Sequence, residues 1–197
     1  EKSAIVRNAP LINSGKVPDL SDRAGDFFFL RRGTPESTAE TIVSLCAERL
    51  PKNMGLDPSQ IQVLSPTRKG PAGTVSLNAR LQAALNPPAP DKKEKLYGDV
   101  VFREGDKVMQ IRNNYDIMWK SADGFVTGTG VFNGDIGTIR EVDFTREAVV
   151  VDFEDRLVTY PFDQLSELEP AWALTVHKAQ GSEYKAVVLA ASAGAPQ

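Results

Sequence analysis

The sequence has very few of the residues on which several classes of function depend. It contains one cysteine, Cys46, and one histidine, His177, in 197 residues. A single cysteine excludes an intrachain disulfide and a cysteine-based zinc site. Cys46 also falls on an apolar helical stripe, so we expect it to lie in the core. No apolar run approaches the roughly 20 residues of a membrane helix, and we therefore expect no membrane partner and a cytoplasmic location.

An overall excess of basic residues is also absent. With 23 lysine and arginine residues against 26 acidic residues, the net charge is −3, which argues against a globally basic nucleic-acid binder. The charge is nevertheless unevenly distributed. Residues 61–98 hold six basic and two acidic residues, whereas residues 135–170 hold ten acidic residues and three arginines. A polyanion should therefore meet the first segment and avoid the second.

Helical and strand-like patterns alternate in the first half of the chain. Residues 3–13 have a loosely helical pattern, and two apolar runs and two amphipathic segments follow. The expected strands are residues 26–30 and 61–66, and the expected helices are residues 35–50 and 77–85. Pro51 should stop the first of these two helices because proline is poorly tolerated inside a helix. The alternation is typical of a parallel sheet covered by helices.

The pattern changes between residues 100 and 160. Short apolar runs are separated there by turn residues such as Asn133-Gly134-Asp135. The runs are residues 100–102, 107–111, 136–139, 148–151 and 157–160. They predict a small antiparallel β-barrel of about five strands. The proline-rich and then lysine-rich stretch 87–95 should be an exposed linker.

After Pro170 the α/β pattern returns and includes an expected strand at residues 186–190. The α/β pieces on either side of the barrel are each too small to form a sheet of their own. We therefore expect an α/β fold in which one parallel sheet is interrupted by the barrel, with boundaries at 1–98, 99–168 and 169–197. The loop that contains Arg68 and the turn that contains His177 should then meet at the same rim of that sheet.

The segment Leu174–Tyr184, LTVHKAQGSEY, carries the most specific chemistry. A hydroxyl, an imidazole and an ammonium group crowd a tight turn, and a glycine and a buried strand follow. Such a turn at the edge of a sheet suits phosphate binding, because a glycine lets a ligand approach the backbone closely. The alternative is a solvent-exposed connection in which His177 caps a turn.

This segment resembles motif V of the RecD-type superfamily 1 DNA helicases, the family of the exodeoxyribonuclease V alpha subunit. The family's form is Thr-x-His-Lys-x-Gln-Gly-x-Glu, which matches Thr175–Glu183. Residues 63–74, followed by Leu77–Gln82 and Asn86-Pro87, resemble the motif IV region of the same family. The two motifs stand in the family's order, with the barrel between them.

Two further segments extend the resemblance over nearly the whole chain. The barrel, with Gly105–Gln110 and Asn133–Gly137, resembles the Src-homology-3-like barrel that the family inserts between motifs IV and V. Residues 3–15 resemble the helix that follows motif III. The chain departs from the family at Pro10, where relatives often carry a histidine.

The resemblance implies a RecA-like sheet of the P-loop NTPase type, as part of the second motor domain of an ATP-dependent helicase that moves DNA 5′ to 3′. It also implies roles for individual residues. The implied contacts to single-stranded DNA are Thr175, His177, Lys178, Arg68 and Lys69. Gly181 and Glu183 are implied to lie toward the nucleotide.

The barrel offers three further candidate DNA contacts, Asn113, Asn114 and Tyr115. Tyr115 has the chemistry to stack on a base. The alternative for Asn113-Asn114 is that the pair only forms a turn, since asparagine is common in turns.

The chain lacks two parts that ATP hydrolysis requires. It has no Gly-x-x-x-x-Gly-Lys-Ser/Thr loop for the phosphates and no acidic pair after a buried strand for magnesium. We therefore expect no catalytic residue, no metal site, no bound cofactor and no ATP turnover in this chain alone. For the parent protein the resemblance implies ATP and Mg²⁺, with single-stranded DNA, an N-terminal motor domain of the same chain and RecB- or RecC-like subunits as partners.

Two other functions stay open from the sequence. The first is a non-catalytic module whose barrel binds nucleic acid or protein while the α/β part serves as a scaffold. The second is an unrelated α/β enzyme with His177 as a base, although the sequence places no nucleophile or third group beside it.

Overall fold

A computed structural model describes residues 3–191, and the chain divides into two compact units. In the first unit, Glu1–Thr34, the described residues from Ser3 onward form one helix, α1 (Ala4–Asn13). The carboxylate of Asp26 accepts a hydrogen bond from the backbone N–H of Ala4 at 2.8 Å. This bond satisfies one of the donors that a helix leaves free at its first turn. The helix expected over residues 3–13 is therefore confirmed.

The prediction of a strand at residues 26–30 is wrong. The segment is irregular, and the side chains of Phe28 and Phe29 are 56% and 50% exposed. Asp26 instead accepts hydrogen bonds from the N–H groups of Ala4 and Ile5 at the start of α1. An apolar run becomes a strand only where a neighbour supplies backbone hydrogen bonds, and within residues 3–191 no strand pairs with this segment.

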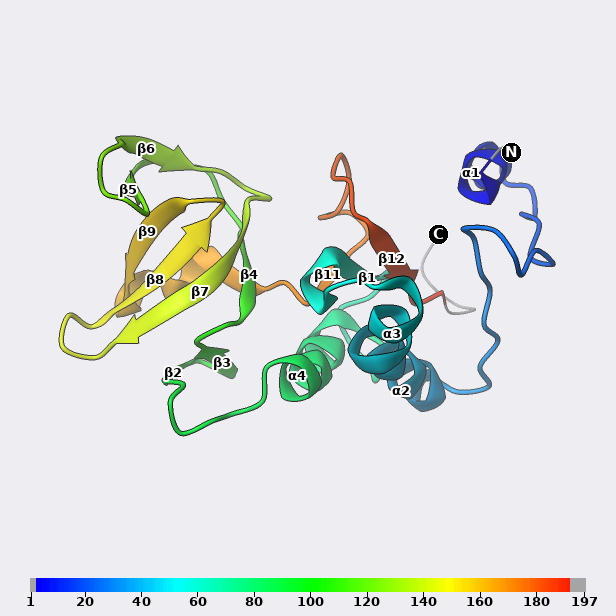
Figure 1. Cartoon of the computed structure of the whole chain (residues 1–197), viewed down its shortest axis with the longest axis horizontal. Coiled ribbons are helices and arrows are strands. Elements are labelled where there is room, and N and C mark those ends of the chain that lie inside the picture. Colours follow the sequence, from blue (N-terminus) through cyan, green and yellow to red (C-terminus); the bar gives the residue numbers. More distant parts are fainter. Residues whose placement is uncertain (1–2, 192–197) are drawn as a thin grey trace. The chain divides into compact units, whose positions relative to one another are not determined.

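The second unit, Pro35–Gln197, contains a three-stranded parallel sheet of order β11-β1-β12 (Figure 1). Its strands are β1 (Ile61–Ser65), β11 (Ala173–Thr175) and β12 (Ala186–Leu189). The central strand precedes the barrel in sequence, and both of its parallel neighbours follow the barrel. The prediction that one parallel sheet joins these two parts of the chain is confirmed. Three strands do not by themselves make the sheet RecA-like.

Helices pack against the parallel sheet. Before β1 lie α2 (Pro35–Ser44), a π-helical turn (Leu45–Arg49), α3 (Leu50–Met54) and a short 3-10 turn (Pro58–Gln60), and after it lies α4 (Thr74–Leu85). Buried side chains of α2 and α4 form a core with Ile61 and Val63 of β1. Cys46 is 1% exposed in this core, as expected, and burial raises the pKa of its thiol to about 12.

Pro51 does not stop the preceding helix, contrary to expectation. It lies inside α3, which ends at Met54 and is capped by Gly55, whose φ is left-handed at 63°. In a regular α-helix the proline ring would clash with the carbonyl four residues earlier. The π-helical turn widens the helix just before the proline, because the N–H of Leu50 donates to the carbonyl of Leu45. The helix therefore passes the proline and ends at a glycine cap.

The chain between β1 and β11 builds a seven-stranded antiparallel sheet of order β10-β4-β7-β8-β9-β5-β6. Its strands are β4 (Lys107–Gln110), β5 (Asn114–Ser121), β6 (Thr127–Val131), β7 (Ile136–Asp143), β8 (Ala148–Phe153), β9 (Arg156–Pro161) and β10 (Leu168–Pro170). A 3-10 helix, Phe162–Glu167, joins β9 to β10. The antiparallel pairing expected of this region is confirmed.

The number of strands differs from the expected five. Four of the expected runs lie in β4, β7, β8 and β9, whereas the run at 100–102 lies in β3 (Val100–Arg103), which pairs with β2 (Glu94–Tyr97) in a separate hairpin. The sequence pattern missed β2, which begins inside the expected linker 87–95, and it missed β5, β6 and β10. β6 contains two glycines, β10 has three residues and ends in proline, and the register of β5 shifts between Asn114 and Met118.

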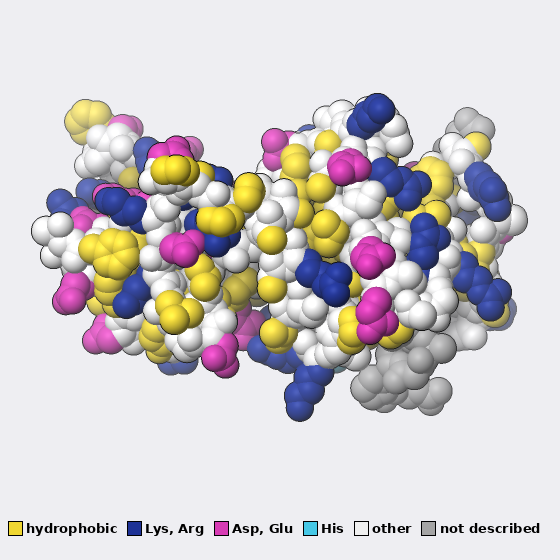
Figure 2. All heavy atoms as spheres, turned by 90° about the horizontal axis from the view of Figure 1, so that it is seen from below, with side chains coloured by type: hydrophobic (Ala, Val, Ile, Leu, Met, Phe, Trp, Pro, Cys, Tyr) yellow, Lys and Arg dark blue, Asp and Glu magenta, His cyan; other side chains and the backbone are white. Residues whose placement is uncertain are grey.

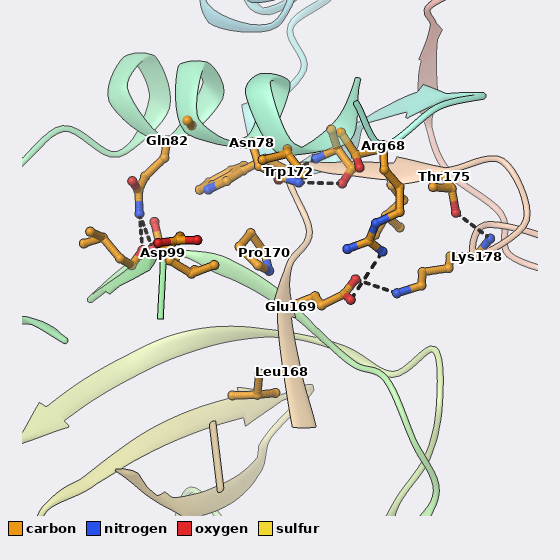
Figure 3. A pocket seen from close by; sticks show the side chains of 18 residues that line it. Arg68, Asn78, Gln82, Asp99, Leu168, Glu169, Pro170, Trp172, Thr175 and Lys178 are labelled. Carbon is orange, nitrogen blue, oxygen red and sulfur yellow. Dashed lines mark hydrogen bonds and ion pairs between the residues drawn. The ribbon is translucent and has the colours of Figure 1, made fainter. Parts of the chain in front are cut away.

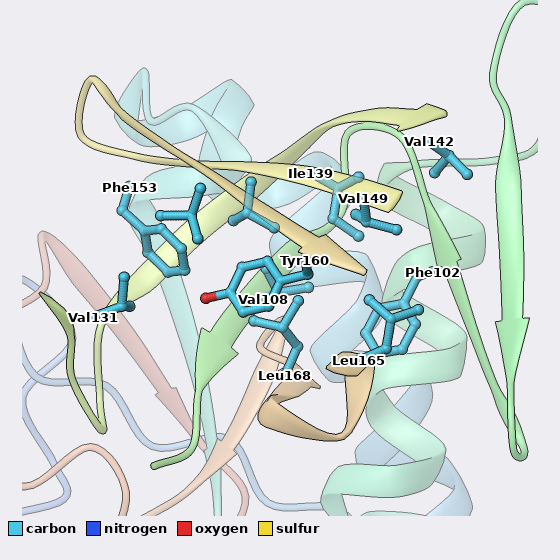
Figure 4. Close-up of a cluster of buried hydrophobic side chains, with 12 residues drawn as sticks. Phe102, Val108, Val131, Ile139, Val142, Val149, Phe153, Tyr160, Leu165 and Leu168 are labelled. Atoms are coloured by element: carbon cyan, nitrogen blue, oxygen red, sulfur yellow. The ribbon is translucent and has the colours of Figure 1, made fainter. Parts of the chain in front are cut away.

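The antiparallel sheet has its own core (Figure 4). Val149, Val151 and Phe153 alternate along β8 and are at most 1% exposed, as period-two burial requires. Tyr160 is fully buried beside them, and its hydroxyl donates to Oε1 of Gln110 at 2.7 Å. The hydroxyl is therefore satisfied, and the core needs no water to balance it.

Alternate side chains of β1 pack against different parts of the fold, so that this strand connects the two sheets. Ile61 and Val63 belong to the helix-covered core, whereas Leu64 packs with Met109 of the antiparallel sheet and with Leu174. Gln62 is fully buried, and Nζ of Lys107 donates to its Oε1 at 2.8 Å. Burial lowers the pKa of Lys107 to about 8.

Candidate functional site

The loop after β1 and the turn after β11 leave the same edge of the parallel sheet. Ser65 and Thr175, the last residues of the two strands, are opposite each other in register. The N–H of Val176 donates to the carbonyl of Ser65 at 3.2 Å. The expectation that the Arg68 loop and the His177 turn meet at one rim is therefore confirmed. Such rims, at the carboxyl ends of parallel strands, are common binding sites in α/β proteins.

The Arg68 loop folds back over the start of α4. The carbonyls of Thr67 and Arg68 accept hydrogen bonds from the N–H groups of Thr74 and Val75 at 3.0 and 3.2 Å. These are first-turn donors that a helix otherwise leaves unpaired. A Cβ atom on Gly73 would lie 2.3 Å from the carbonyl oxygen of Lys69, so the loop closes in this way only over a glycine. The backbone that carries Arg68 is thereby fixed.

A pocket of about 370 Å³ opens beside this loop (Figure 3). Apolar groups form much of its wall, among them Val75 of α4, Val100 of β3, Pro170 of β10 and Trp172. The indole Nε1 of Trp172 is buried and has no hydrogen-bond partner within residues 3–191. The polar side chains that line the pocket are Arg68, Thr74, Asn78, Gln82, Asp99, Asp106, Glu169, Thr175 and Lys178. The pocket therefore combines an apolar wall with charged groups of both signs.

Asn78 holds one wall of the pocket in place. Its Nδ2 donates to the carbonyl of Ala173, and the N–H of Ala173 donates to its Oδ1, both at 2.9 Å. Because β11 is an edge strand, the amide takes the place of a missing neighbouring strand.

Asp106 holds another wall. It accepts hydrogen bonds from Gln82 at 2.7 Å and from Asn86 at 2.8 Å, and burial raises the pKa of its carboxyl. These bonds join α4 to the turn before β4.

Arg68 and Lys178 converge on Glu169 from two directions (Figure 3). Nη1 of Arg68 lies 3.4 Å from Oε1 of Glu169, and Nζ of Lys178 lies 2.5 Å from Oε2. One carboxylate thus joins a cation of the loop after β1 to a cation of the turn after β11.

The turn after β11 is fixed by its own backbone. The carbonyl of Thr175 accepts hydrogen bonds from the N–H groups of Lys178 and Ala179 at 3.0 and 3.3 Å. Lys178 lines the pocket, whereas His177 is exposed and lies outside the pocket lining. Lys69 of the other loop is likewise exposed outside it. The structure therefore brings Arg68, Thr175 and Lys178 together but not His177 or Lys69.

Gly181 and Glu183, implied to lie toward the nucleotide, follow this turn. Gly181 adopts a left-handed φ of +84°, a conformation that favours glycine. Glu183 is exposed and lines a second hollow, of about 280 Å³, with Asp135 of the turn before β7 and Arg156 of β9. Neither residue lines the first pocket.

The three candidates in the barrel lie outside the pocket lining. Oδ1 of Asn113 accepts from the N–H of Asn133 at 3.0 Å, and Nδ2 of Asn114 donates to Glu167 at 3.0 Å. These bonds shape the loop before β5 and favour a structural role for the two amides. Tyr115 is 66% exposed, and its ring meets that of Phe132 edge to face at 5.5 Å.

The arginines of the acidic segment 135–170 form ion pairs within that segment. Arg140, Arg146 and Arg156 each lie within 4 Å of an aspartate of the same segment, at 3.9, 3.5 and 3.9 Å. On the face shown in Figure 2, basic and acidic side chains are interspersed. The arginines of this segment therefore offer a polyanion little free positive charge.

Residues that sequence reasoning missed include Glu169, Asn78 and Trp172. Asn78 stands in the motif IV segment, but nothing in its local pattern shows that it pairs with Ala173. Glu169 stands in the acidic segment 135–170, which we expected a polyanion to avoid.

Within residues 3–191, no group of three or more His, Cys, Asp or Glu side chains could hold a metal ion. No helix in that range is long and apolar enough to cross a membrane.

Two helicase domain families match the chain. The family described as the ATP-dependent RecD-like DNA helicase SH3 domain matches residues 77–153, and the UvrD-like helicase C-terminal domain matches residues 170–197. The first match includes β4 to β8, and the second includes β11, its turn and β12. The two matches thus fall on the antiparallel sheet and on the later part of the parallel sheet.

Two solved structures of Pif1 from Bacteroides are weakly similar. The one bound to single-stranded DNA is 14% identical, with a TM-score of 0.41, and covers 81% of this chain and 43% of that chain. The unliganded one is 13% identical, with a TM-score of 0.36, and covers 64% and 44%. Likenesses this weak add nothing to the assignment.

Curated relatives give a stronger likeness. The ATP-dependent RecD2 DNA helicase of Deinococcus radiodurans is 35% identical over 187 residues, which are 95% of this chain and 22% of that protein. An uncharacterised protein of Methanocaldococcus jannaschii is 31% identical over 145 residues, which are 66% of this chain and 12% of that protein. The chain thus spans less than a quarter of these relatives. Both helicase domains match in the family's order along one chain, so the resemblance to the RecD-type superfamily 1 helicases is confirmed.

Proposed function

We propose that this chain is part of the second motor domain of an ATP-dependent DNA helicase, and that its pocket rim contacts the backbone of single-stranded DNA. One observation carries the proposal. Arg68 follows β1, Thr175 ends the neighbouring parallel strand β11, Lys178 follows it, and all three line one pocket. Cationic and hydroxyl groups bind phosphate without reading sequence, which translocation along DNA requires.

The remaining candidate contacts extend this surface in the proposal. His177 is exposed on the same turn as Lys178, and Lys69 is exposed on the same loop as Arg68, so both can reach a passing strand. Tyr115 offers an exposed ring for stacking on a base. Asn113 and Asn114 would act by holding the loop before Tyr115.

The domain roles belong to the proposal as well. Residues 1–98 and 169–197 would form a RecA-like motor domain around the barrel at 99–168, with Gly181 and Glu183 toward the nucleotide. ATP and Mg²⁺ would be held by an N-terminal motor domain of the same longer protein, which would move 5′ to 3′ and could act with RecB- or RecC-like subunits. The description of the D. radiodurans relative as an ATP-dependent DNA helicase supports the use of ATP by the longer protein.

An ATPase assay with single-stranded DNA tests the division of labour between the domains. We expect the 197 residues alone to hydrolyse no ATP, since the sequence lacks the phosphate-binding loop. A longer protein with both motor domains should show DNA-stimulated hydrolysis and should unwind duplexes with a 5′ tail but not those with a 3′ tail. Appreciable hydrolysis by the isolated 197 residues would contradict the proposal.

A second candidate function is a binding module that uses the β5–β6 hairpin. Met118, Phe125 and Val126 are 69%, 89% and 55% exposed on this one hairpin, and exposed apolar surface of this kind favours a partner. Loss of all single-strand binding on replacement of Phe125 and Val126 by serine, with binding unchanged in Arg68→Gln and Lys178→Met, would favour this candidate over the pocket rim.

A further inference from the structure

We infer that the carboxylate of Glu169 is a built-in competitor of the DNA phosphate: it occupies the place between Arg68 and Lys178 that a phosphate takes when the strand binds. The inference rests on the proposed function and adds to it a residue that regulates the affinity of the same rim.

The contacts of Glu169 imitate those of a bound phosphate. Each of its two oxygens contacts a different cation, Nη1 of Arg68 at 3.4 Å and Nζ of Lys178 at 2.5 Å. Arginine and lysine bind carboxylates and phosphates through the same charge-assisted hydrogen bonds, and an arginine fork fits the oxygen spacing of either anion. Two cations that share one carboxylate are therefore already spaced to share one phosphate.

The backbone of Glu169 is fixed, so that only its side chain has to move. Its strand β10 pairs with β4 on both sides of it, with Leu168 opposite Gln110 and Pro170 opposite Val108. The N–H of Ala171 continues this pairing by donating to the carbonyl of Lys107 at 2.8 Å. A change of side-chain rotamer is then enough to release both cations.

The exposure of the three side chains permits this exchange. The side chains of Arg68, Glu169 and Lys178 are 56%, 27% and 28% exposed, respectively. A phosphate can therefore reach the two cations from solvent. Ion pairs this open contribute only modestly, up to about fivefold each in an equilibrium constant. The competition is therefore strong enough to measure and weak enough for a strand to overcome.

The test is the affinity of the 197-residue chain and its variants for a fluorescent oligothymidylate over a series of salt concentrations. We expect Glu169→Gln to bind about fivefold more tightly at low salt, because both cations become free. Glu169→Ala should bind more tightly as well, and it serves if the glutamine variant does not fold.

The matched control is the substitution Glu141→Gln. Glu141 is an exposed residue of β7 that does not line the pocket. It changes the net charge equally and reports the general effect of removing an acid. A double variant, Glu169→Gln with Lys178→Met, should lose most of the gain, since coupled residues are not additive.

The outcomes separate this inference from the proposed function. If the unaltered chain binds the oligonucleotide but Glu169→Gln and Glu169→Ala bind no better than Glu141→Gln, the competitor role is overturned while the DNA site stands. A lower affinity in the Glu169 variants also overturns it, since Glu169 would then only position the cations. If neither the unaltered chain nor any variant binds, the proposed function itself fails.

Discussion

Asn78 and Ala173 exchange two hydrogen bonds, each at 2.9 Å, although they lie on opposite sides of the barrel in sequence. The amide of a helix thereby closes the free edge of β11, the strand that leads into the turn carrying Lys178. The same contact forms a wall of the pocket. Both the stability of the fold and the shape of the pocket therefore depend on Asn78.

Replacing Asn78 by alanine should lower the free energy of unfolding by about 2 kcal/mol, because a buried N–H and a buried C=O both lose their partner. Asn53→Ala is the control, since Asn53 is exposed on α3, and it should change stability by less than about 0.5 kcal/mol. Urea denaturation measures both. Equal effects in the two variants would show that the Asn78 pair contributes nothing.

The parts of this fold that were predictable carry local patterns. β1, α4 and β12 have apolar repeats, and all three appear where expected. β12 is less buried than expected, because Val187 and Leu189 are 50% and 56% exposed. The segment 26–30 has an equally apolar pattern but forms no strand, since a strand depends on a neighbour that the local sequence does not describe. β6 was missed for the opposite reason, because its glycines carry no burial signal although its neighbours hold it in the sheet.

Lys107 should make the stability of the fold depend on pH. Its pKa is about 8 in the folded chain against an ordinary value of 10.5, so between these pH values the unfolded chain binds more protons than the folded one. The free energy of unfolding therefore rises with pH in that window, by up to about 3 kcal/mol. Below about pH 8 the cost of burying the charge is fully present, and above about pH 10.5 it is gone.

The measurement compares wild type with Lys107→Met by urea denaturation at pH 7 and at pH 10. The stability difference should move in favour of the wild type at the higher pH, whatever its sign at pH 7. Lys52→Met, at an exposed lysine of α3, reports the general effect of removing a lysine. A difference that stays constant between the two pH values would mean that Lys107 does not pay a burial cost.

Gly73 should tolerate no side chain. A Cβ atom there would meet backbone oxygens of Lys69 and Arg68 at 2.3 and 2.6 Å, and backbone cannot move aside as a flexible side chain can. We expect Gly73→Ala to lower the free energy of unfolding by about 2 kcal/mol and to weaken binding of single-stranded DNA by displacing Arg68. Gly33→Ala is the control, because a Cβ atom there meets nothing within 4 Å. An unfolding curve for Gly73→Ala that overlays that of Gly33→Ala would refute the close approach.

The candidate site was predictable only in part, because its contacts connect distant segments. The sequence placed Arg68 and the motif V turn at one rim, since both follow strands of a parallel sheet. It did not place Lys178 against Glu169, because the return of β10 beside the rim depends on how the whole antiparallel sheet pairs. Local sequence showed which chemistry was present, and only the tertiary fold shows which charges meet.

Binding of single-stranded DNA should depend on salt through individual cations of the rim. Lys178→Met removes one contact to phosphate, so the slope of log affinity against log salt should fall by about 0.7, in addition to a loss of affinity at low salt. His177→Ala should weaken binding as well, because its exposed ring lies on the same turn. Lys52→Met on α3, outside the pocket lining, should leave the slope unchanged. If Lys178→Met and Lys52→Met gave the same slope as the wild type, the strand would not touch Lys178, and the phosphate contact would have to be sought elsewhere on the chain.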